Sequence, residues 1–185
     1  PEDLAQIGDE CGPAHAAVIA ARGTLQDEAE PAAPPRSIDP EAAGLSELFF
    51  AASTFERRQI LINLEFAAWA PAEPAALERK DVWRLEAATL QHNLETVARE
   101  FERALGISHQ QAQRIIQDEL GEPVVVAAKA LALPSEVLQR MLLFVNPHIG
   151  QSIDRVYELA ELYGEITVDA ARRMIALLRD ADPAE

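Results

Sequence analysis

The sequence is poor in cysteine and has no long hydrophobic run. Cys11 is the only cysteine among 185 residues. A single cysteine cannot form an intramolecular disulfide, and a chain of this kind is typical of a reducing compartment, so we expect a cytoplasmic protein. We find no apolar run long enough to span a bilayer and no signal segment, so we expect no membrane association. Because the sequence does not begin with methionine, we expect it to be part of a longer protein.

Basic and aromatic residues are also scarce. The chain has 16 Lys and Arg against 31 Asp and Glu, which gives a formal net charge of −15. Such a surface repels phosphate backbones, so we expect no binding to nucleic acid. Aromatic residues make up 5% of the chain, whereas 49% of its residues are hydrophobic, dominated by Ala and Leu. These two residues favour closely packed helices, so the expected fold class is all-α.

Sequence motifs for catalysis or cofactor binding are missing too. Neither G-x-G-x-x-G nor a Gly-Lys-Ser/Thr ending occurs, so no phosphate-binding loop is expected. No pair of histidines has metal-ligand spacing, and His92 with Glu95 reverses the Glu-x-x-His order of di-iron bundles. Cys11 and His15 are separated by a Gly-Pro pair, which argues against a catalytic dyad. We therefore predict no catalytic residue, no metal and no cofactor, and a protein that is not an enzyme.

The sequence does contain a nearly continuous series of helical patterns in its second part. Residues 1–22 hold two short helical patterns and are expected to be an N-terminal arm, the remnant of an upstream region. Residues 23–44 are rich in Pro, Ala and acid, with little to bury, so we expect a linker. Residues 45–182 are expected to form the α-helical domain. The longest helical pattern, 75–105, ends at Gly106 and is predicted to be the spine of this domain.

Shorter helices are expected beyond this spine, each ending where Gly, Pro or Asn makes continuation costly. They are predicted at 108–120, 122–132, 134–145, 149–163 and 167–180. The β-branched run VVVAA at 124–128 follows a Glu-Pro step and continues into helix formers, so we interpret it as the first turn of a buried helix.

A ten-residue pattern occurs three times, as ISHQQAQRII (107–116), LPSEVLQRML (133–142) and ITVDAARRMI (166–175). Each copy has an apolar residue, a helix-starting residue, an arginine and two large apolar residues, and the arginines are Arg114, Arg140 and Arg173. Helices that cannot bury their own apolar stripe stack on neighbours, as in helical-repeat proteins. We predict an irregular, HEAT-like helical-repeat array, or a multi-helix bundle built around the long helix. The alternative explanation is that capping rules alone make unrelated helix starts look alike.

Two stretches, ELFFAASTFERRQILINLE (47–65) and GISHQQAQRIIQDELGEPVVVAAKALALPSEV (106–137), resemble a family of bacterial, mostly alphaproteobacterial, proteins. The similar features are an apolar-Phe-Phe-Ala-Ala-Ser segment followed by Arg57 and Arg58, and a Gly-Glu-Pro-apolar step before an Ala-rich helix that ends in Leu-Pro. The family is grouped as domain of unknown function 2336, and the resemblance covers roughly residues 45–145. It implies an α-helical, repeat-like cytoplasmic protein with no assigned activity and no catalytic residues to transfer.

These observations favour a non-enzymatic protein-protein interaction or regulatory helical module, whose acidic surface would attract a basic protein partner. The candidate interaction face consists of four aromatic residues: Phe49, Phe50, Trp69 and Trp83. Core packing is the alternative role for these aromatics. The alternative function is a small-molecule-sensing helical domain with an apolar interhelical pocket, lined by residues such as Met141, Phe144, Tyr157 and Tyr163. Homodimerisation through the long helix is compatible with either function.

Overall fold

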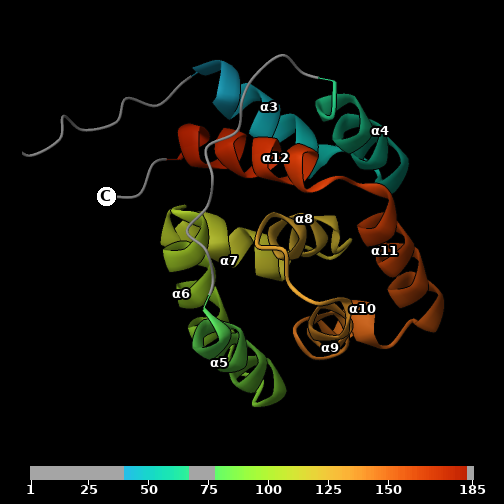
Figure 1. Cartoon of the computed structure of the whole chain (residues 1–185). Helices are drawn as coiled ribbons and strands as arrows, with labels where there is room; N and C mark the ends of the chain where they lie inside the picture. The colour runs from blue at the N-terminus through green and yellow to red at the C-terminus, as the bar shows by residue number, and fades with distance from the viewer. Residues whose placement is uncertain (1–39, 67–77, 183–185) are drawn as a thin grey trace, which may run out of the picture. The chain divides into compact units, whose positions relative to one another are not determined.

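The computed structural model describes residues 40–66 and 78–182, and every regular element in these two ranges is an α-helix (Figure 1). The all-α prediction is therefore confirmed. The helices are α3 (Pro40–Ala51), α4 (Thr54–Leu64), α5 (Arg79–Leu90), α6 (Leu94–Leu105), α7 (His109–Gln117), α8 (Glu122–Ala130), α9 (Ser135–Phe144), α10 (Pro147–Gly150), α11 (Ile153–Glu165) and α12 (Val168–Ala181). No helix in the described part is long and apolar enough to cross a membrane. The predicted arm, 1–22, and Trp69 lie outside the described residues.

Helix α3 begins inside the segment that the sequence predicted to be a linker. The linker prediction, 23–44, is wrong for residues 40–44, because Pro40 occupies the first position of the helix. A proline is tolerated there, since its missing N–H has no helical partner in the first turn. Ala42 is buried, so the first turn already contacts the core. Because an alanine side chain is small, this turn has no strong apolar pattern in the sequence.

The predicted spine helix, 75–105, is two helices. Helices α5 and α6 are separated by a turn in which His92 has a φ of 52°, a left-handed conformation that ends a right-handed helix. Asn93 then caps α6, because its side chain accepts a hydrogen bond from the Thr96 N–H at 3.1 Å. The apolar periodicity continues across this short turn, and it therefore suggested one helix where there are two. A bundle built around one long helix is thus excluded for the described residues.

The centre of the packing is α8, a short helix whose residues are buried on all sides except at Lys129. Its run Val124–Ala128 is fully enclosed, so the prediction of a buried helix at this position is confirmed. Small Val and Ala side chains let α8 contact α7, α9, α11 and α12. Helix α12 in turn packs against α3 and α4 (Figure 1), while Arg57 of α4 reaches Glu122 at the start of α8 directly.

The three copies of the ten-residue pattern begin helices α7, α9 and α12, as predicted. The hydroxyls of Ser108 and Thr167 accept hydrogen bonds from backbone N–H groups in the first turn. The apolar residues that precede the caps are all buried: Ile107, Leu133 and Ile166. The three helices nevertheless have different neighbours, because α7 packs on α6, α9 on α5 and α12 on α3. Capping chemistry accounts for the likeness of their starts, and a regular repeat stays a prediction.

Candidate functional site

The first of the three repeated arginines, Arg114, ties α7 to α3. Its guanidinium forms an ion pair with Glu47, with an Nη2 to Oε2 distance of 2.9 Å. The same guanidinium lies over the ring of Phe50, 3.9 Å from the ring centroid. Hydrogen bonds and charge from Arg114 lower the pKa of the Glu47 carboxyl below its ordinary value. Arg114 therefore covers Phe50 rather than leaving that aromatic open to a partner.

The other two arginines make different connections. Arg140 of α9 forms an ion pair with Glu86 of α5, and the arginine side chain is 46% exposed. Arg173 of α12 donates hydrogen bonds from Nη1 to the carbonyl oxygens of Leu64 and Glu65, both at 2.7 Å. These carbonyls end α4 and have no helical partner, so Arg173 satisfies the C-terminal end of that helix. The three arginines connect helices and do not form one site.

A cluster of four charged side chains joins α4, the α7–α8 connection, α8 and α11. We call Arg57, Asp118, Glu122 and Arg155 the ionic cluster. The two oxygens of Asp118 accept hydrogen bonds from Arg57 at 2.7 and 3.0 Å. Glu122 accepts one from Arg57 at 3.2 Å and one from Arg155 at 2.5 Å. Arg57 is 2% exposed and Glu122 is fully buried, so two cations and two anions neutralise one another inside the protein.

The ionic cluster also fixes the backbone around it. Asp118 Oδ1 accepts hydrogen bonds from the N–H groups of Leu120 and Gly121, which shapes the turn that leads into α8. Gly121 has a φ of 87°, and a Cβ at this position would lie 2.6 Å from Ile149 Cδ1. Only glycine meets both constraints. Arg57 donates to the carbonyl oxygens of Phe50 and Ala52, at 2.7 and 3.0 Å, and so holds the connection between α3 and α4.

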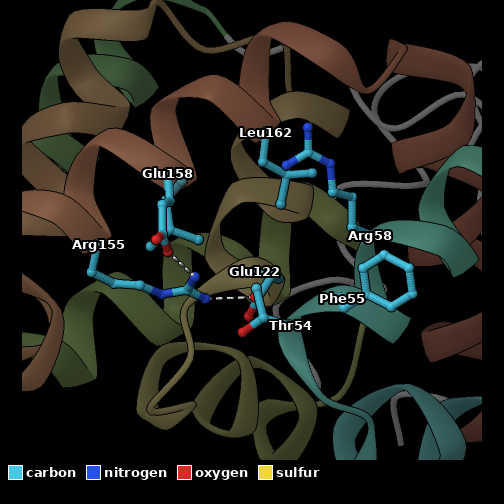
Figure 2. Close-up of a pocket in the computed structure, with 8 residues that line it drawn as sticks. Thr54, Phe55, Arg58, Glu122, Arg155, Glu158 and Leu162 are labelled. Atoms are coloured by element: carbon cyan, nitrogen blue, oxygen red, sulfur yellow. Dashed lines mark hydrogen bonds and ion pairs between the residues drawn. The ribbon is translucent and has the colours of Figure 1, made fainter.

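A pocket of about 340 Å³ opens beside this cluster, between the start of α4 and α11 (Figure 2). Figure 2 shows the Arg155 guanidinium between Glu122 and Glu158, with Phe55 across the opening. Burial lowers the pKa of Arg155, but hydrogen bonds to Glu122 and Glu158 outweigh this and raise it overall. Both oxygens of Glu122 are occupied by guanidinium groups, so this carboxylate is not placed as a free general base. The charges at this pocket act as a joint between helices.

A second depression, the α3–α4 groove, lies on the other side of α4 and encloses about 430 Å³. It is lined by Leu48, Ala51, Ala52, Glu56, Gln59, Ile60 and Asn63. Leu48 is 56% exposed although it is a large apolar residue. Leu45, 42% exposed, lies one turn before Leu48 and extends the same apolar surface along α3. This exposed leucine pair distinguishes the groove from the pocket in Figure 2.

Polar side chains border the α3–α4 groove along α4. Glu56 belongs to a capping box with Ser53, whose N–H and hydroxyl both donate to Oε2, at 2.9 and 2.7 Å. These hydrogen bonds lower the pKa of Glu56 below its ordinary value of 4.5, and they leave Oε1 open. The side-chain amides of Gln59 and Asn63 have no hydrogen bond within the described part of the chain. The groove thus combines an apolar floor with solvent-exposed polar groups at its border.

The predicted aromatic face is only partly at the surface. Phe49 is fully buried, with its ring edge-on to Phe50 and 5.4 Å from the Arg57 guanidinium carbon, so its assignment to an exposed face is wrong. Phe50 is half-buried, whereas Trp83 on α5 is 68% exposed. In an α-helix consecutive side chains point about 100° apart, so the adjacent Leu48 and Phe49 cannot face the same way. The helix buries Phe49 and exposes Leu48.

The residues predicted to line a sensing pocket are not brought together either. Met141 is fully buried in the core, whereas Tyr157 is 68% exposed and cannot line an enclosed cavity. The hydroxyl of Tyr163 donates to the Leu133 carbonyl oxygen at 2.5 Å, and burial raises the pKa of this tyrosine. Phe144 packs edge-on against His92, with 5.6 Å between the ring centroids. These four side chains have four separate surroundings.

Two histidines of the described part, His92 and His109, use their side chains as hydrogen-bonding groups. His92 places Nδ1 3.0 Å from the carbonyl oxygen of Phe144, which ties the α5–α6 turn to α9. His109 places Nδ1 2.9 Å from Glu102 Oε2, and its Nε2 lies 3.0 Å from the side-chain amide nitrogen of Gln113 and 3.6 Å from Glu95 Oε2. Among the described residues, no group of three or more His, Cys, Asp and Glu side chains is arranged to hold a metal ion.

No family model matches the chain, and neither a curated protein nor a solved structure matches it. The resemblance of residues 47–65 and 106–137 to domain of unknown function 2336 therefore stays a prediction. The structure gives these two stretches a physical connection, because Arg57 in the first is paired with Asp118 and Glu122 in the second. The function of the chain has to be inferred from this geometry.

Proposed function

We propose that this chain is a non-enzymatic, cytoplasmic protein-binding module whose partner docks in the α3–α4 groove. The observation that carries the proposal is the exposure of Leu48 beside the apolar floor of the groove. Burial of apolar surface contributes about 25 cal/mol per Å², so a partner that covers these side chains gains free energy from water exclusion. Protein interfaces commonly have an apolar centre and a polar border, which is the arrangement around Leu48.

The walls of the groove are held in place from behind, which supports the same proposal. Arg57 fixes the α3–α4 connection, and Arg173 satisfies the C-terminal end of α4. The N-terminal end of α4 is fixed by the capping box of Ser53 and Glu56. A surface held at both ends loses little conformational entropy when it binds, and this preorganisation favours affinity.

A second candidate function is favoured by the pocket in Figure 2. Its volume of about 340 Å³ is within the usual range for small-molecule sites, and Leu159 and Leu162 give it an apolar wall. Its charged groups, however, are already paired within the protein, so a ligand there has few free polar partners. A small-molecule sensor is therefore the second candidate and the protein-binding module the first.

The proposal is tested by comparing the proteins that three immobilised versions of the 185-residue chain capture from a lysate of the source organism. The wild type is compared with Leu48→Asp in the groove and Ile153→Asp on α11, whose side chain is 72% exposed. We expect one protein to be retained in stoichiometric amount by the wild type and by Ile153→Asp, and to fall about tenfold or more with Leu48→Asp, as at interface hot spots.

Circular dichroism of the three chains controls for folding, because both substitutions replace an exposed apolar residue by aspartate. Equal retention of every captured protein by Leu48→Asp and wild type would overturn the proposal. A small molecule that remains bound through purification, and that is lost from a variant of the Figure 2 pocket such as Leu159→Ala, would establish the sensor instead.

A further inference from the structure

We infer that the occupant of the α3–α4 groove is a basic amphipathic helix of another protein. This inference rests on the proposed function and adds the chemistry of the partner. Three observations support it: the spacing of the side chains that border the groove, the negative charge at the groove, and the paired backbone of its two helices.

The spacing of the groove residues fits a helix. On α3 the row is Leu45, Leu48 and Ala51, and on α4 it is Glu56, Ile60 and Asn63, each at intervals of three or four residues. Such rows form ridges on each helix and leave a channel between them into which the ridge of a third helix packs. A partner helix with apolar residues at i, i+3, i+4 and i+7 matches that channel.

The backbone of the groove argues against an extended peptide. Peptides that bind as added strands gain most of their affinity from main-chain hydrogen bonds to an exposed sheet edge. Both walls of this groove are α-helices, whose central N–H and C=O groups are already paired within the helix. The groove therefore contacts a partner through side chains only. The best occupant is a segment whose own N–H and C=O groups are hydrogen-bonded to each other, which is a helix.

The charge of the groove selects a basic helix. Glu56 is the one charged residue among the described residues that line the groove, and none of these described residues donates a hydrogen bond to its Oε1. The two arginines that follow it are occupied elsewhere, because Arg57 is in the ionic cluster and Arg58 pairs with Glu165. A Lys or Arg at the border of a partner helix would meet this carboxylate, and the net charge of −15 would attract such a helix over longer distances.

The same charges disfavour two other occupants. A second copy of the chain would bring another Glu56 and another net charge of −15 to the interface, so like charges would face each other. An anionic membrane surface would be repelled for the same reason. A basic helix brings the apolar stripe without this repulsion.

The test uses the 185-residue chain and two labelled synthetic peptides of about 18 residues, long enough to form a helix on binding. Both peptides have leucine at i, i+3, i+4 and i+7, and the remaining positions are mostly lysine in one and mostly glutamate in the other. Fluorescence anisotropy gives the dissociation constants, and circular dichroism measures the helix that forms on binding. We expect the lysine peptide to bind with a gain of helix and the glutamate peptide not to bind.

Matched variants separate the groove from general attraction to an acidic surface. Leu48→Asp should weaken binding of the lysine peptide about tenfold or more, whereas Ile153→Asp, with the same change of charge, should not. Glu56→Gln keeps the capping box but removes the charge, so it should weaken binding about two- to fivefold, as for an exposed ion pair. Glu161→Gln on the exposed side of α11 is its control and should have no effect.

The outcomes distinguish this inference from the proposed function. If a cellular partner depends on Leu48 but the two peptides bind equally, or neither binds, the module remains and the basic helix is overturned. If neither peptide nor any cellular protein depends on Leu48, both proposals fail. If light scattering shows a dimer that Leu48→Asp converts to a monomer, the occupant is a second copy and the inference is overturned.

Discussion

The two sides of α4 use charge in opposite ways. On one side Arg57 is buried in the ionic cluster, where both oxygens of Glu122 and both oxygens of Asp118 accept hydrogen bonds. On the other side Glu56 keeps one oxygen open beside the exposed Leu48. The neighbouring residues Arg57 and Glu56 thus belong to different surroundings, the first to the joint between helices and the second to the proposed docking surface. The carboxylates of the ionic cluster have both oxygens paired, and they connect helices within the fold. The Glu56 carboxylate has one oxygen available beside apolar surface, where it can bind a partner.

The largest expected effect comes from breaking the joint. Arg57→Met removes a buried cation and leaves Asp118 and Glu122 with less compensation, so the free energy of unfolding should fall by about 3–5 kcal/mol. Urea unfolding followed by circular dichroism measures this change. The neighbouring Arg58→Met, which alters a half-exposed pair with Glu165, should cost less than about 1 kcal/mol.

A second variant keeps this prediction testable if Arg57→Met does not fold. In Arg57→Met with Glu122→Gln, the ionic cluster keeps one cation, Arg155, and one carboxylate, Asp118, so its charges balance again and part of the lost stability should return. Equal stability of Arg57→Met and the wild type would show that the ionic cluster does not hold the helices together.

The turn beside the joint should be nearly as sensitive. Gly121→Ala places a Cβ against Ile149 and Leu159 at a φ of 87°, so we expect a loss of about 2–4 kcal/mol in the free energy of unfolding. Gly164 is the matched control, because it lies within α11 and a Cβ there meets nothing within 4 Å. Gly164→Ala should raise stability by about 0.5–1 kcal/mol. A similar loss for both substitutions would contradict the role of the turn.

Substitutions of the three repeated arginines should give smaller losses of stability, and they test whether the three positions are equivalent. Arg173→Ala leaves two carbonyl groups at the end of α4 without their donor, so we expect a loss of about 1–3 kcal/mol. Arg140→Ala removes an ion pair at the surface and should cost less than about 1 kcal/mol. Arg114→Ala should lie between them, since it loses both an ion pair and a ring contact. Three equal losses in thermal or urea unfolding would instead favour equivalent positions of a true repeat.

The smallest expected effect concerns pH. Hydrogen bonds from Ser53 lower the pKa of Glu56 below 4.5, so the folded protein holds this proton more weakly than the unfolded chain. The stability that Glu56 contributes is therefore present above its unfolded pKa of 4.5 and is lost as the pH falls through the lower folded pKa. The slope of unfolding free energy against pH, measured between about pH 3 and 7, should become shallower in Glu56→Gln. An unchanged slope in that variant would contradict the assignment.

The helix starts are the part of the fold that the sequence predicts best. Caps such as Ser108 and Thr167 depend on residues within one turn, and both were found as predicted. The break at His92 was missed because it is short and keeps the apolar residues of α5 and α6 in phase. Its signal was Asn93, a common capping residue, which the apolar periodicity outweighed. Helix caps can thus be predicted from neighbouring residues. Where a capping residue and the apolar periodicity favour different structures, packing decides between them.

The site was less predictable, for two physical reasons. Leu48, Phe49 and Phe50 are adjacent and apolar, and the choice of which faces the core depends on where α12 packs against α3. Their sequence therefore indicates that one large residue remains exposed, but not which one. The ionic cluster joins positions 61 and 65 residues apart, so no local spacing could have revealed it. Glu122 by itself resembles an ordinary acidic residue in the first turn of a helix.

The ionic cluster also has a consequence for the order in which the chain is made. Protein synthesis proceeds from the N-terminus, so Arg57 and Glu122 leave the ribosome before Arg155, the second guanidinium that Glu122 requires. Until α11 follows, Glu122 has only half of its charge partners and costs free energy to bury. The core around α8 is therefore completed only after α11 has been synthesised. In a nascent chain that ends before Arg155, α8 is not yet covered by α11.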